Sequence, residues 1–275
     1  MGAGSPHLIG WSGDAVADSV LAVIDADTTV IEFSVWGGWD RSLAGQARIV
    51  LDKCLAEHPT GIVVDLHELS DPHAASAPLW LTACSQGAAM EPPVTIALCA
   101  RANAPLARRM TRLGARDWLV LYAGVSQARA AVAGRRVLHN RMHLALPPDP
   151  AAAISARSLV SDACREWDLE HLHQRARLVV SELVVNAAEH AGTDVEVIVS
   201  PRGSGAAAAL HLAVYDGDPI LPRLRDPVTG PLGPSLEDRG LGLRIVGAAA
   251  SAWGALPARS GKLVWAIVRG RPETG

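Results

Sequence analysis

The chain has 275 residues, of which 49% are hydrophobic and 19% charged, and its formal net charge is −3. This length suits two domains of ordinary size better than one, and the apolar fraction excludes disorder of the whole chain. The small net charge gives no electrostatic basis for binding nucleic acid or an anionic membrane surface.

The cysteines are scattered along the chain and form no CxxC pair or Cys/His cluster. We therefore expect neither a disulfide framework nor a zinc site, but free thiols in a reducing cytoplasm. The first residues lack a basic segment followed by an apolar stretch, so no signal peptide is expected. No apolar run reaches the roughly 18 residues needed to span a bilayer. The sequence thus predicts a cytoplasmic protein without membrane contact.

The first half of the chain alternates strand-like and helix-like segments, separated by short breaks rich in Pro and Gly. Strands that alternate with helices in this way indicate an α/β layer domain. In chain order, the patterns predict a strand at Thr28–Val35, a helix at Ser42–Glu57, a strand at Ile62–Leu66, a helix at Ala77–Ala89, a strand at Val94–Cys99, a helix at Pro105–Leu113, a strand at Trp118–Leu121 and a helix at Val125–Arg135.

Prolines concentrated in Leu144–Pro150 interrupt the chain, and a new helix can begin after them. We therefore expect a first domain at 1–136, a linker at 137–146 and a second domain at 147–275. Helices on one face of a mixed sheet would make the second domain an α+β sandwich. Its predicted elements are helices at Ala151–Trp167 and Glu170–Ala191, strands at Asp194–Ser200 and Ala208–Tyr215, a loop at Asp216–Arg239, a helix at Leu241–Ala252, and strands at Trp253–Leu256 and Lys262–Val268.

Polar residues recur at intervals of four in the second long helix of this domain. The segment SELVVNAAEH places Glu182, Asn186 and His190 on nearly one helix face. An amide oxygen suits Mg²⁺, and a carboxylate one turn away can accept a proton from a nucleophile near a γ-phosphate. A solvated polar face is the competing interpretation. The opposite face is predicted to be apolar, with Leu178, Val180, Leu183, Val184 and Ala187.

Two further motifs follow in order. Asp216-Gly217-Asp218 follows a predicted strand, where a carboxylate can accept a hydrogen bond from an exocyclic amine, although an ordinary Asp-Gly turn is the favoured interpretation of this motif by itself. The segment RGLGL at residues 239–243 then opens a helix, and its glycines let backbone N–H groups approach phosphate oxygens. No βαβ unit surrounds this GxG, so a Rossmann site is not indicated. Gly261-Lys262 begins the last strand.

Taken together, ELVxNAxxH, DGDP, a Pro- and Gly-rich loop, RGLGL and GKLVW resemble the histidine-kinase-like ATPase superfamily, known as the Bergerat fold. Within it the order is similar to that of anti-sigma factor serine kinases, over roughly Pro147–Arg269. The resemblance implies ATP and Mg²⁺ as ligands, Glu182 as the general base, Asn186 as the Mg²⁺ ligand, Asp216 as the adenine-binding carboxylate, and 216–239 as a lid. The nucleotide-binding set that it implies is Asn186, Asp216, Asp218, Arg239, Gly240, Leu241, Gly242 and Gly261.

The chain departs from this family pattern at two positions. Asp218 stands where a second glycine commonly follows the adenine-binding aspartate, and Lys262 stands where a threonine is often found. The first change adds a negative charge near the expected nucleotide. ATP binding remains the expectation, while protein-serine/threonine kinase activity is left open.

The first domain is similar to the STAS fold of anti-anti-sigma factors, on the segment from Ile62 to the helix near Ala77. Asp65, Leu66 and Leu69 match the family's DLxxL pattern, but Ala74 stands where the phosphorylatable serine would be. Alanine has no hydroxyl, so that phosphorylation switch cannot operate at residue 74. We interpret this domain as a degenerate STAS domain kept for docking or packing, rather than one in which Ser70 or Ser76 replaces the acceptor.

The leading hypothesis is an ATP-binding transcription regulator that acts by partner switching. Its partners would be a sigma factor or an anti-anti-sigma STAS protein, and it would phosphorylate a serine on the latter. A non-catalytic binding module, in which ATP is a structural ligand, is the alternative. A sensor histidine kinase is less well supported, because no upstream dimerisation helix carries a phosphorylatable histidine. The sequence leaves the oligomeric state open, a homodimer included.

Overall fold

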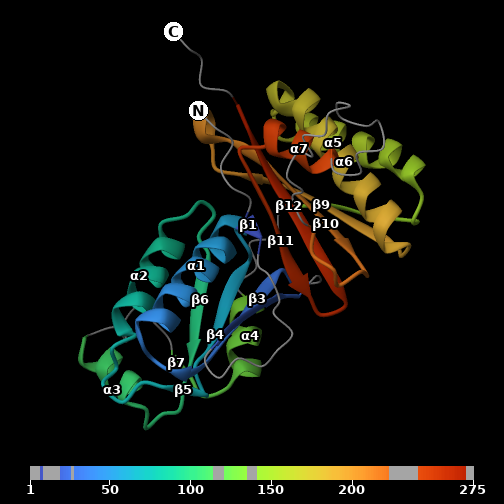
Figure 1. Cartoon of the computed structure of the whole chain (residues 1–275). Helices are drawn as coiled ribbons and strands as arrows, with labels where there is room; N and C mark the ends of the chain where they lie inside the picture. Colours follow the sequence, from blue (N-terminus) through green and yellow to red (C-terminus); the bar gives the residue numbers. More distant parts are fainter. Residues whose placement is uncertain are drawn as a thin grey trace, which may run out of the picture. The chain divides into compact units, whose positions relative to one another are not determined.

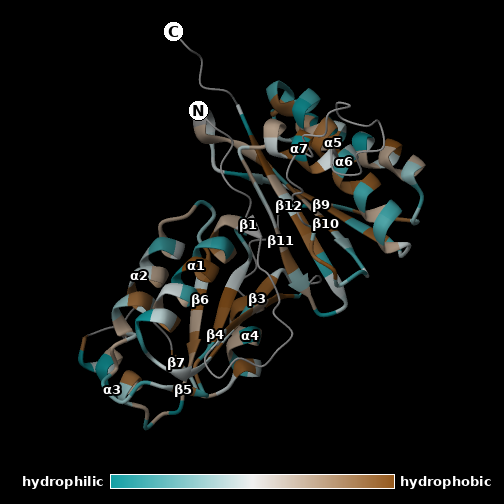
Figure 2. Ribbon diagram, in the orientation of Figure 1, coloured by the Kyte–Doolittle hydropathy of each residue, from teal (hydrophilic) through white to brown (hydrophobic). Residues whose placement is uncertain are grey.

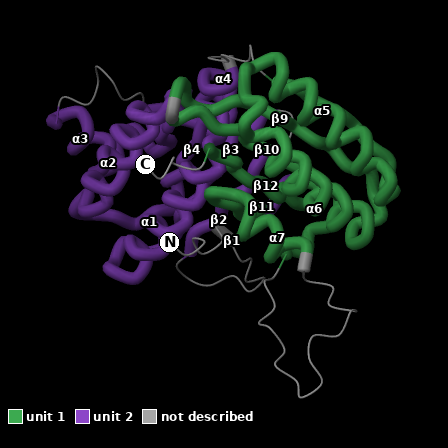
Figure 3. Tube along the Cα trace, turned by 90° about the horizontal axis from the view of Figure 1, so that it is seen from above, with its two compact units in different colours: residues 1–8, 139–256, 260–275 green, residues 9–138, 257–259 purple. Residues whose placement is uncertain are grey.

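Figure 1 shows the computed structural model of the chain. It describes residues 7–8, 19–25, 28–113, 121–134, 141–222 and 241–270. The chain divides into two compact units, coloured in Figure 3: unit 1 comprises residues 1–8, 139–256 and 260–275, and unit 2 comprises residues 9–138 and 257–259. Each unit contributes its own set of strands and helices.

Unit 2 is built on a sheet with the strand order β7-β6-β4-β3-β2. Strands β3, β4, β6 and β7 pair in parallel, and β2 pairs antiparallel with β3. The strands are β2 (Ser19–Ile24), β3 (Val30–Gly38), β4 (Gly61–Asp65), β6 (Thr95–Cys99) and β7 (Leu121–Tyr122), with the short β5 (Leu69–Ser70) beside the end of β3. Most of the predicted strand at 118–121 lies outside the described residues.

The helices of unit 2 are α1 (Arg41–Glu57), α2 (Ala77–Ala88), α3 (Pro105–Arg112) and α4 (Val125–Gly134). Helix α1 begins after Asp40, whose carboxylate accepts a hydrogen bond from the backbone N–H of Leu43. Helix α4 packs over one face of the sheet through a buried apolar cluster that includes Val63 and Val132. The alternation of strands and helices confirms the α/β layer architecture predicted for the first half. Strand β2 was not predicted.

Unit 1 has a sheet with the strand order β11-β12-β10-β9-β8. Strand β10 pairs antiparallel with both β9 and β12, and β8 pairs antiparallel with β9. The strands are β8 (Met142–Leu146), β9 (Val195–Arg202), β10 (Ala209–Asp216), β11 (Ala252–Ala258) and β12 (Gly261–Arg269), and the short β1 (His7–Leu8) lies beside β11.

Three helices cover one face of this sheet: α5 (Ala153–Glu166), α6 (His173–Ala191) and α7 (Leu241–Ala249) (Figure 1). Short 3₁₀ turns at Pro150–Ala152 and Glu170–Leu172 precede α5 and α6. Every second residue of β10, namely Leu210, Leu212 and Val214, joins α5 and α6 in one apolar core. In Figure 2 the brown colour of hydrophobic residues runs along the strands of this sheet. The helices-on-one-face arrangement predicted for the second half is therefore present.

The predicted linker at 137–146 is wrong over its second part, because Met142–Leu146 forms strand β8. Met142 and Leu144 pack against the apolar core of unit 1, and Leu146 is buried in it. The prolines after Leu146 end this strand rather than separate two domains. Residues 135–140 lie outside the described part of the chain. Among the described residues, no helix is both long and apolar enough to cross a membrane.

Candidate functional site

Helix α6 carries the polar stripe noted in the sequence, and Gly192 ends the helix in the left-handed conformation, with a φ of 60°. Glu182 and Asn186 are half-buried, whereas His190 is exposed. The prediction that Leu178 belongs to the apolar face is wrong, because its exposed fraction is 45%. Leu178 lies one turn before Glu182 and so falls on the polar stripe.

The first turn of α7 meets this stripe at Gly242. A Cβ atom at Gly242 would lie 2.9 Å from Oε2 of Glu182 and 3.2 Å from the amide oxygen and nitrogen of Asn186. Any side chain at residue 242 would displace these polar groups. The structure therefore brings a carboxylate, an amide and the glycine at the start of a helix to one place in unit 1.

Burial acts on both polar side chains of this group. Partial burial, followed by the nearby charge of Glu189, raises the pKa of Glu182 above its usual range. Asn186 has a buried side-chain Nδ2 with no hydrogen-bond partner among the described residues. A buried amide without a partner costs free energy, so a ligand that supplies the missing contact would be bound favourably.

A second group of polar residues lies where β10 ends and β12 begins. Asp216, the last residue of β10, stands opposite Lys262 in the antiparallel register, and both are 5% exposed. Asp216 continues the period of two that directs Leu212 and Val214 toward the helices. Gly261 has a φ of +124°, and a Cβ atom there would overlap the carbonyl oxygen of Asp216. Only glycine fits this close approach of the two strands.

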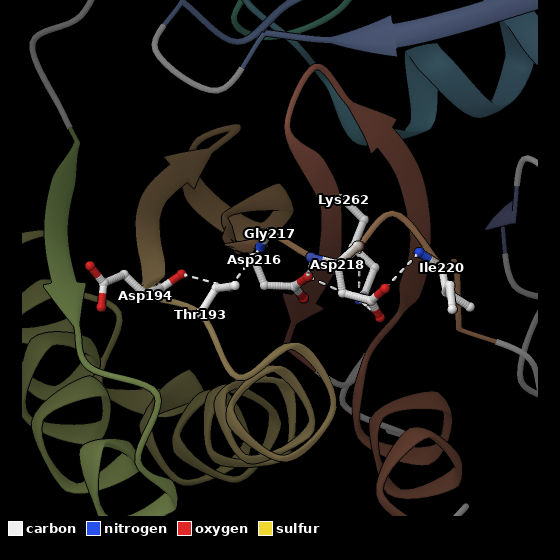
Figure 4. A network of polar contacts seen from close by, with 7 residues as sticks. All are labelled: Thr193, Asp194, Asp216, Gly217, Asp218, Ile220 and Lys262. Atoms are coloured by element: carbon white, nitrogen blue, oxygen red, sulfur yellow. Dashed lines mark hydrogen bonds and ion pairs between the residues drawn. The ribbon is translucent and has the colours of Figure 1, made fainter.

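Lys262 holds the two aspartates of this turn together (Figure 4). Its ammonium nitrogen lies 2.9 Å from Oδ1 of Asp216 and 2.9 Å from Oδ2 of Asp218. It also donates to the backbone carbonyl of Asp218 at 3.1 Å. Oδ1 of Asp216 accepts a further hydrogen bond from the backbone N–H of Asp218, at 2.9 Å. Oδ2 of Asp216 is buried and has no partner among the described residues.

The two carboxyl groups respond differently to this environment. Burial raises the pKa of Asp216 above its usual value, and the hydrogen bond and positive charge of Lys262 oppose that rise without cancelling it. Burial would also raise the pKa of Asp218, but the hydrogen bonds from Lys262 and the backbone N–H of Ile220 outweigh it and lower the pKa. His190 adds a smaller lowering effect on Asp218. Asp218 is thus held ionised more firmly than Asp216.

The predicted nucleotide residues fall into two groups in the structure. Glu182, Asn186 and Gly242 lie together, and Asp216, Asp218 and Gly261 form the turn described above. Leu241 is the first residue of α7. Arg239, Gly240 and the part of the predicted lid at 223–238 lie outside the described residues, so their roles in nucleotide binding remain predictions.

Two residues of this region were not assigned a role from the sequence. Thr193, just after α6, accepts a hydrogen bond through its hydroxyl oxygen from the backbone N–H of Gly217, at 2.8 Å. This bond ties the turn after β10 to the end of α6. Lys262 was noted only as a departure from a family pattern. Its role depends on the strand register opposite Asp216, which no local pattern specifies.

In unit 2, the loop before α2, where the sequence resembles the STAS pattern, uses its polar groups for hydrogen bonds within the loop. Asp71 accepts hydrogen bonds from the backbone N–H of Ala75 and, through its other oxygen, from the N–H and hydroxyl of Ser76. Ser76 is fully buried, so its hydroxyl is not available as a phosphate acceptor. Ala74 is buried as well, with a φ of 52°. Ser70 is exposed.

Unit 2 also has a cavity of about 490 Å³ beyond the ends of β4 and β6, next to Ser70 and Arg101. Arg101 donates a hydrogen bond to the carboxylate of Glu68 at 3.1 Å, and both side chains are largely exposed. No group of three or more His, Cys, Asp or Glu side chains arranged to hold a metal ion occurs among the described residues of either unit.

No known protein family matches the chain, and no curated protein is significantly similar to it in sequence. Among solved structures, the chain is similar to an anti-sigma factor antagonist from Mycobacterium paratuberculosis, with 20% sequence identity and a TM-score of 0.35. The similarity covers 42% of this chain and 94% of the other. The function proposed below rests on the geometry of unit 1 and on the ordered motifs, not on this similarity.

Proposed function

We propose that unit 1 binds ATP together with Mg²⁺, and that the protein uses this site as a regulator of transcription. The observation that carries the proposal is the position of Gly242 against Glu182 and Asn186. A helix with a glycine in its first turn offers backbone N–H groups and a positive helix end to phosphate oxygens. Phosphates bound there would lie next to an amide that can bind Mg²⁺ and a carboxylate that can accept a proton.

The side chains present fit Mg²⁺ bound through a nucleotide rather than a metal site made by the protein alone. Mg²⁺ prefers one or two protein oxygens, with phosphates and waters completing its shell. Asn186 would supply the protein ligand through Oδ1, and its buried Nδ2, which has no partner among the described residues, would donate a hydrogen bond to a phosphate oxygen. The metal would neutralise charge on the phosphates when bound. Glu182, with its raised pKa, is suited to accept a proton from a hydroxyl.

The turn after β10 would receive the base of the nucleotide. Oδ2 of Asp216 has no partner among the described residues, whereas the other oxygen of this carboxyl group accepts from Lys262 and from the N–H of Asp218. An exocyclic amino group, such as that of adenine, is a neutral donor that could satisfy this oxygen. The base would then lie close to the end of α6, which Thr193 ties to the turn.

The ordered motifs resemble those of anti-sigma factor serine kinases, and on that basis we propose regulation by partner switching. The protein would bind a sigma factor or an anti-anti-sigma STAS protein and transfer a phosphoryl group to a serine of the latter. Unit 2 would be a degenerate STAS domain that docks or packs, because Ala74 has no hydroxyl and Ser76 is buried against Asp71. The acceptor serine would thus belong to another protein.

A non-catalytic ATP-binding module is the second candidate. The observation that favours it is the set of ion pairs around Lys262, which fixes the turn that receives the base and suits tight binding without turnover. Incubation of the chain with labelled ATP and a panel of STAS proteins separates the two candidates. Transfer of label to a serine supports the kinase, whereas retained ATP binding without transfer to any of them supports the binding module.

Calorimetric titration of ATP, with and without Mg²⁺, tests the proposal itself. In the native chain we expect Mg²⁺ to increase the affinity, and in Asn186→Ala we expect this increase to fall by about 100-fold. Asn103→Ala is the matched control, since Asn103 is an exposed residue of unit 2. An unchanged Mg²⁺ effect in Asn186→Ala would overturn the assignment of this site.

A further inference from the structure

Lys262 and Asp218, the two departures from the family pattern that the motifs resemble, contact each other. The ammonium nitrogen of Lys262 lies 2.9 Å from Oδ2 of Asp218. They come from different parts of the chain, one in β12 and the other in the turn after β10, and only the strand register brings them together. The negative charge added by Asp218 is therefore matched by a positive charge next to it.

Every hydrogen atom of the Lys262 ammonium group has an acceptor. An ammonium group has three N–H donors, and here Oδ1 of Asp216, Oδ2 of Asp218 and the carbonyl oxygen of Asp218 receive them. Lys262 is 5% exposed, so water does not replace these contacts readily. The lysine is consequently unable to donate to a ligand without giving up a bond to an aspartate.

The same contacts divide the oxygens of Asp216 into two kinds. Oδ1 accepts from Lys262 and from the N–H of Asp218, so its acceptor positions are filled. Oδ2 is buried and has no partner among the described residues. Asp218 is likewise committed, because its oxygens accept from Lys262 and from the N–H of Ile220. Among the described residues, Oδ2 of Asp216 is therefore the one oxygen of these two carboxylates that accepts no hydrogen bond.

We propose that Lys262 and Asp218 act together as positioning residues, which keep Oδ2 of Asp216 free to accept a hydrogen bond from the 6-amino group of a purine. This inference rests on the proposed nucleotide function and names two residues through which its base selectivity arises. Neither residue touches the base. Asp218 draws the lysine away from Oδ2, and Lys262 holds Asp216 in its ionised, acceptor-only form.

The chemistry of the cluster selects a 6-amino over a 6-oxo purine. An ionised carboxylate accepts hydrogen bonds and donates none, so it attracts an amino group and repels a carbonyl oxygen. If Asp216 became protonated, its hydroxyl could donate to a 6-oxo group and the selectivity would fall. The charged groups that act on Asp216 among the described residues are Lys262 from β12 and Asp218 from the turn, and His190 at the end of α6 acts on Asp218.

Removing either positioning residue should weaken ATP binding, for opposite reasons. In Lys262→Met only the backbone N–H of Asp218 still opposes the effect of burial on Asp216, so the pKa of Asp216 rises and the carboxyl group becomes protonated at a higher pH than in the native chain. In Asp218→Gly the lysine loses one acceptor and turns toward Oδ2, while the pKa of Asp216 falls because a neighbouring negative charge has gone. Each change would cost the base its one hydrogen bond to the Asp216 carboxylate, which corresponds to roughly 10- to 100-fold in affinity.

The test is a double-mutant cycle with ATP and inosine triphosphate, a 6-oxo purine, as probes. We expect Lys262→Met and Asp218→Gly each to lose about tenfold or more in ATP affinity, and Asp218→Gly/Lys262→Met to return to within about threefold of the native chain. In Lys262→Met the preference for ATP over inosine triphosphate should also shrink as the pH is lowered. Additive losses in the double variant, or an unchanged preference, would overturn the proposal.

Two further measurements keep the outcome interpretable. Thermal unfolding of each variant, with Lys53→Met in α1 as the matched lysine control, shows whether a loss of binding comes from loss of fold. A carbon-detected NMR titration of the Asp216 carboxyl group, without nucleotide, should show a higher pKa in Lys262→Met and a lower pKa in Asp218→Gly. If the variants show pKa shifts of this sign but the native chain binds no ATP, the nucleotide function alone is refuted. If the variants show no such shifts, the positioning role is refuted.

Discussion

Asp65 in unit 2 and Asp216 in unit 1 each end a buried strand and begin the same local turn. In both, Oδ1 accepts a hydrogen bond from the backbone N–H two residues later, at 3.0 Å for His67 and 2.9 Å for Asp218. Their surroundings differ. The carboxylate of Asp65 is one-third exposed and contacts the His67 ring, whereas that of Asp216 is 1% exposed and contacts Lys262.

A comparison with Asp71 of unit 2 shows which feature makes Asp216 a candidate for binding a ligand. In unit 2, the buried Asp71 has both oxygens occupied by donors from its own loop. In unit 1, the buried Asp216 keeps one oxygen without a partner among the described residues. Burial alone is common to Asp71 and Asp216. The free oxygen is what makes unit 1 the candidate for a ligand, and the following variants test this contrast.

The largest effect is expected for Glu182→Gln in unit 1. The amide keeps the size of the side chain but cannot accept the proton of a serine hydroxyl, so phosphoryl transfer should fall by about 100- to 10,000-fold. ATP affinity should change by less than about threefold. Transfer of label to a STAS protein and calorimetry measure the two quantities. Transfer at the native rate would show that Glu182 is not the general base.

Asp71→Ala should produce the largest loss of stability in unit 2. The change removes three accepted hydrogen bonds and leaves the buried hydroxyl of Ser76 without its acceptor. Loss of such contacts costs about 2–4 kcal/mol of unfolding free energy. Denaturant unfolding measures this, and ATP affinity below the transition should not change. A weaker ATP affinity in the folded variant would contradict the assignment of binding to unit 1.

Gly242→Ala should weaken ATP binding by about tenfold with little change in stability. The added methyl group would displace the flexible carboxylate of Glu182 and the amide of Asn186, rather than backbone atoms. Gly45→Ala in α1 is the matched control, because a Cβ atom at Gly45 meets no atom within 4 Å. The control should bind ATP normally and unfold with about 0.5–1 kcal/mol more free energy. Equal affinities of the two variants would argue against Gly242 at the phosphates.

The smallest effect concerns the pH dependence of unit 2. The hydrogen bond that the His67 ring donates to the carboxylate of Asp65 raises the pKa of His67 above its usual value. Because the folded pKa is raised, the interaction stabilises the fold fully below about pH 6.5, and the stabilisation is lost as the pH rises through the folded pKa. For a partly exposed pair, we expect under about 1 kcal/mol. Unfolding of Asp65→Asn at pH 5.5 and pH 8.5 measures it: the difference from the native chain should be larger at pH 5.5.

Much of the fold follows from local patterns in the sequence. Short apolar runs predict β10 and β12, and helical spacing with Pro and Gly breaks predicts α1, α2 and α6 close to their observed ends. Strand β8 was not predicted. Only Met142, Leu144 and Leu146 form its apolar face, and what makes this short segment a strand is its pairing with β9, which is distant in the sequence. A short edge strand before prolines has the local pattern of a linker.

The sequence by itself determined the helix stripe of Glu182 and Asn186 and the turn at Asp216, since both depend on residues at most four positions apart. Tertiary structure alone decided which groups meet them. The antiparallel register places Lys262 against Asp216, and the packing of α7 on α6 places Gly242 against the stripe. Such contacts join residues far apart in the chain, so their geometry depends on packing and register rather than on local preference.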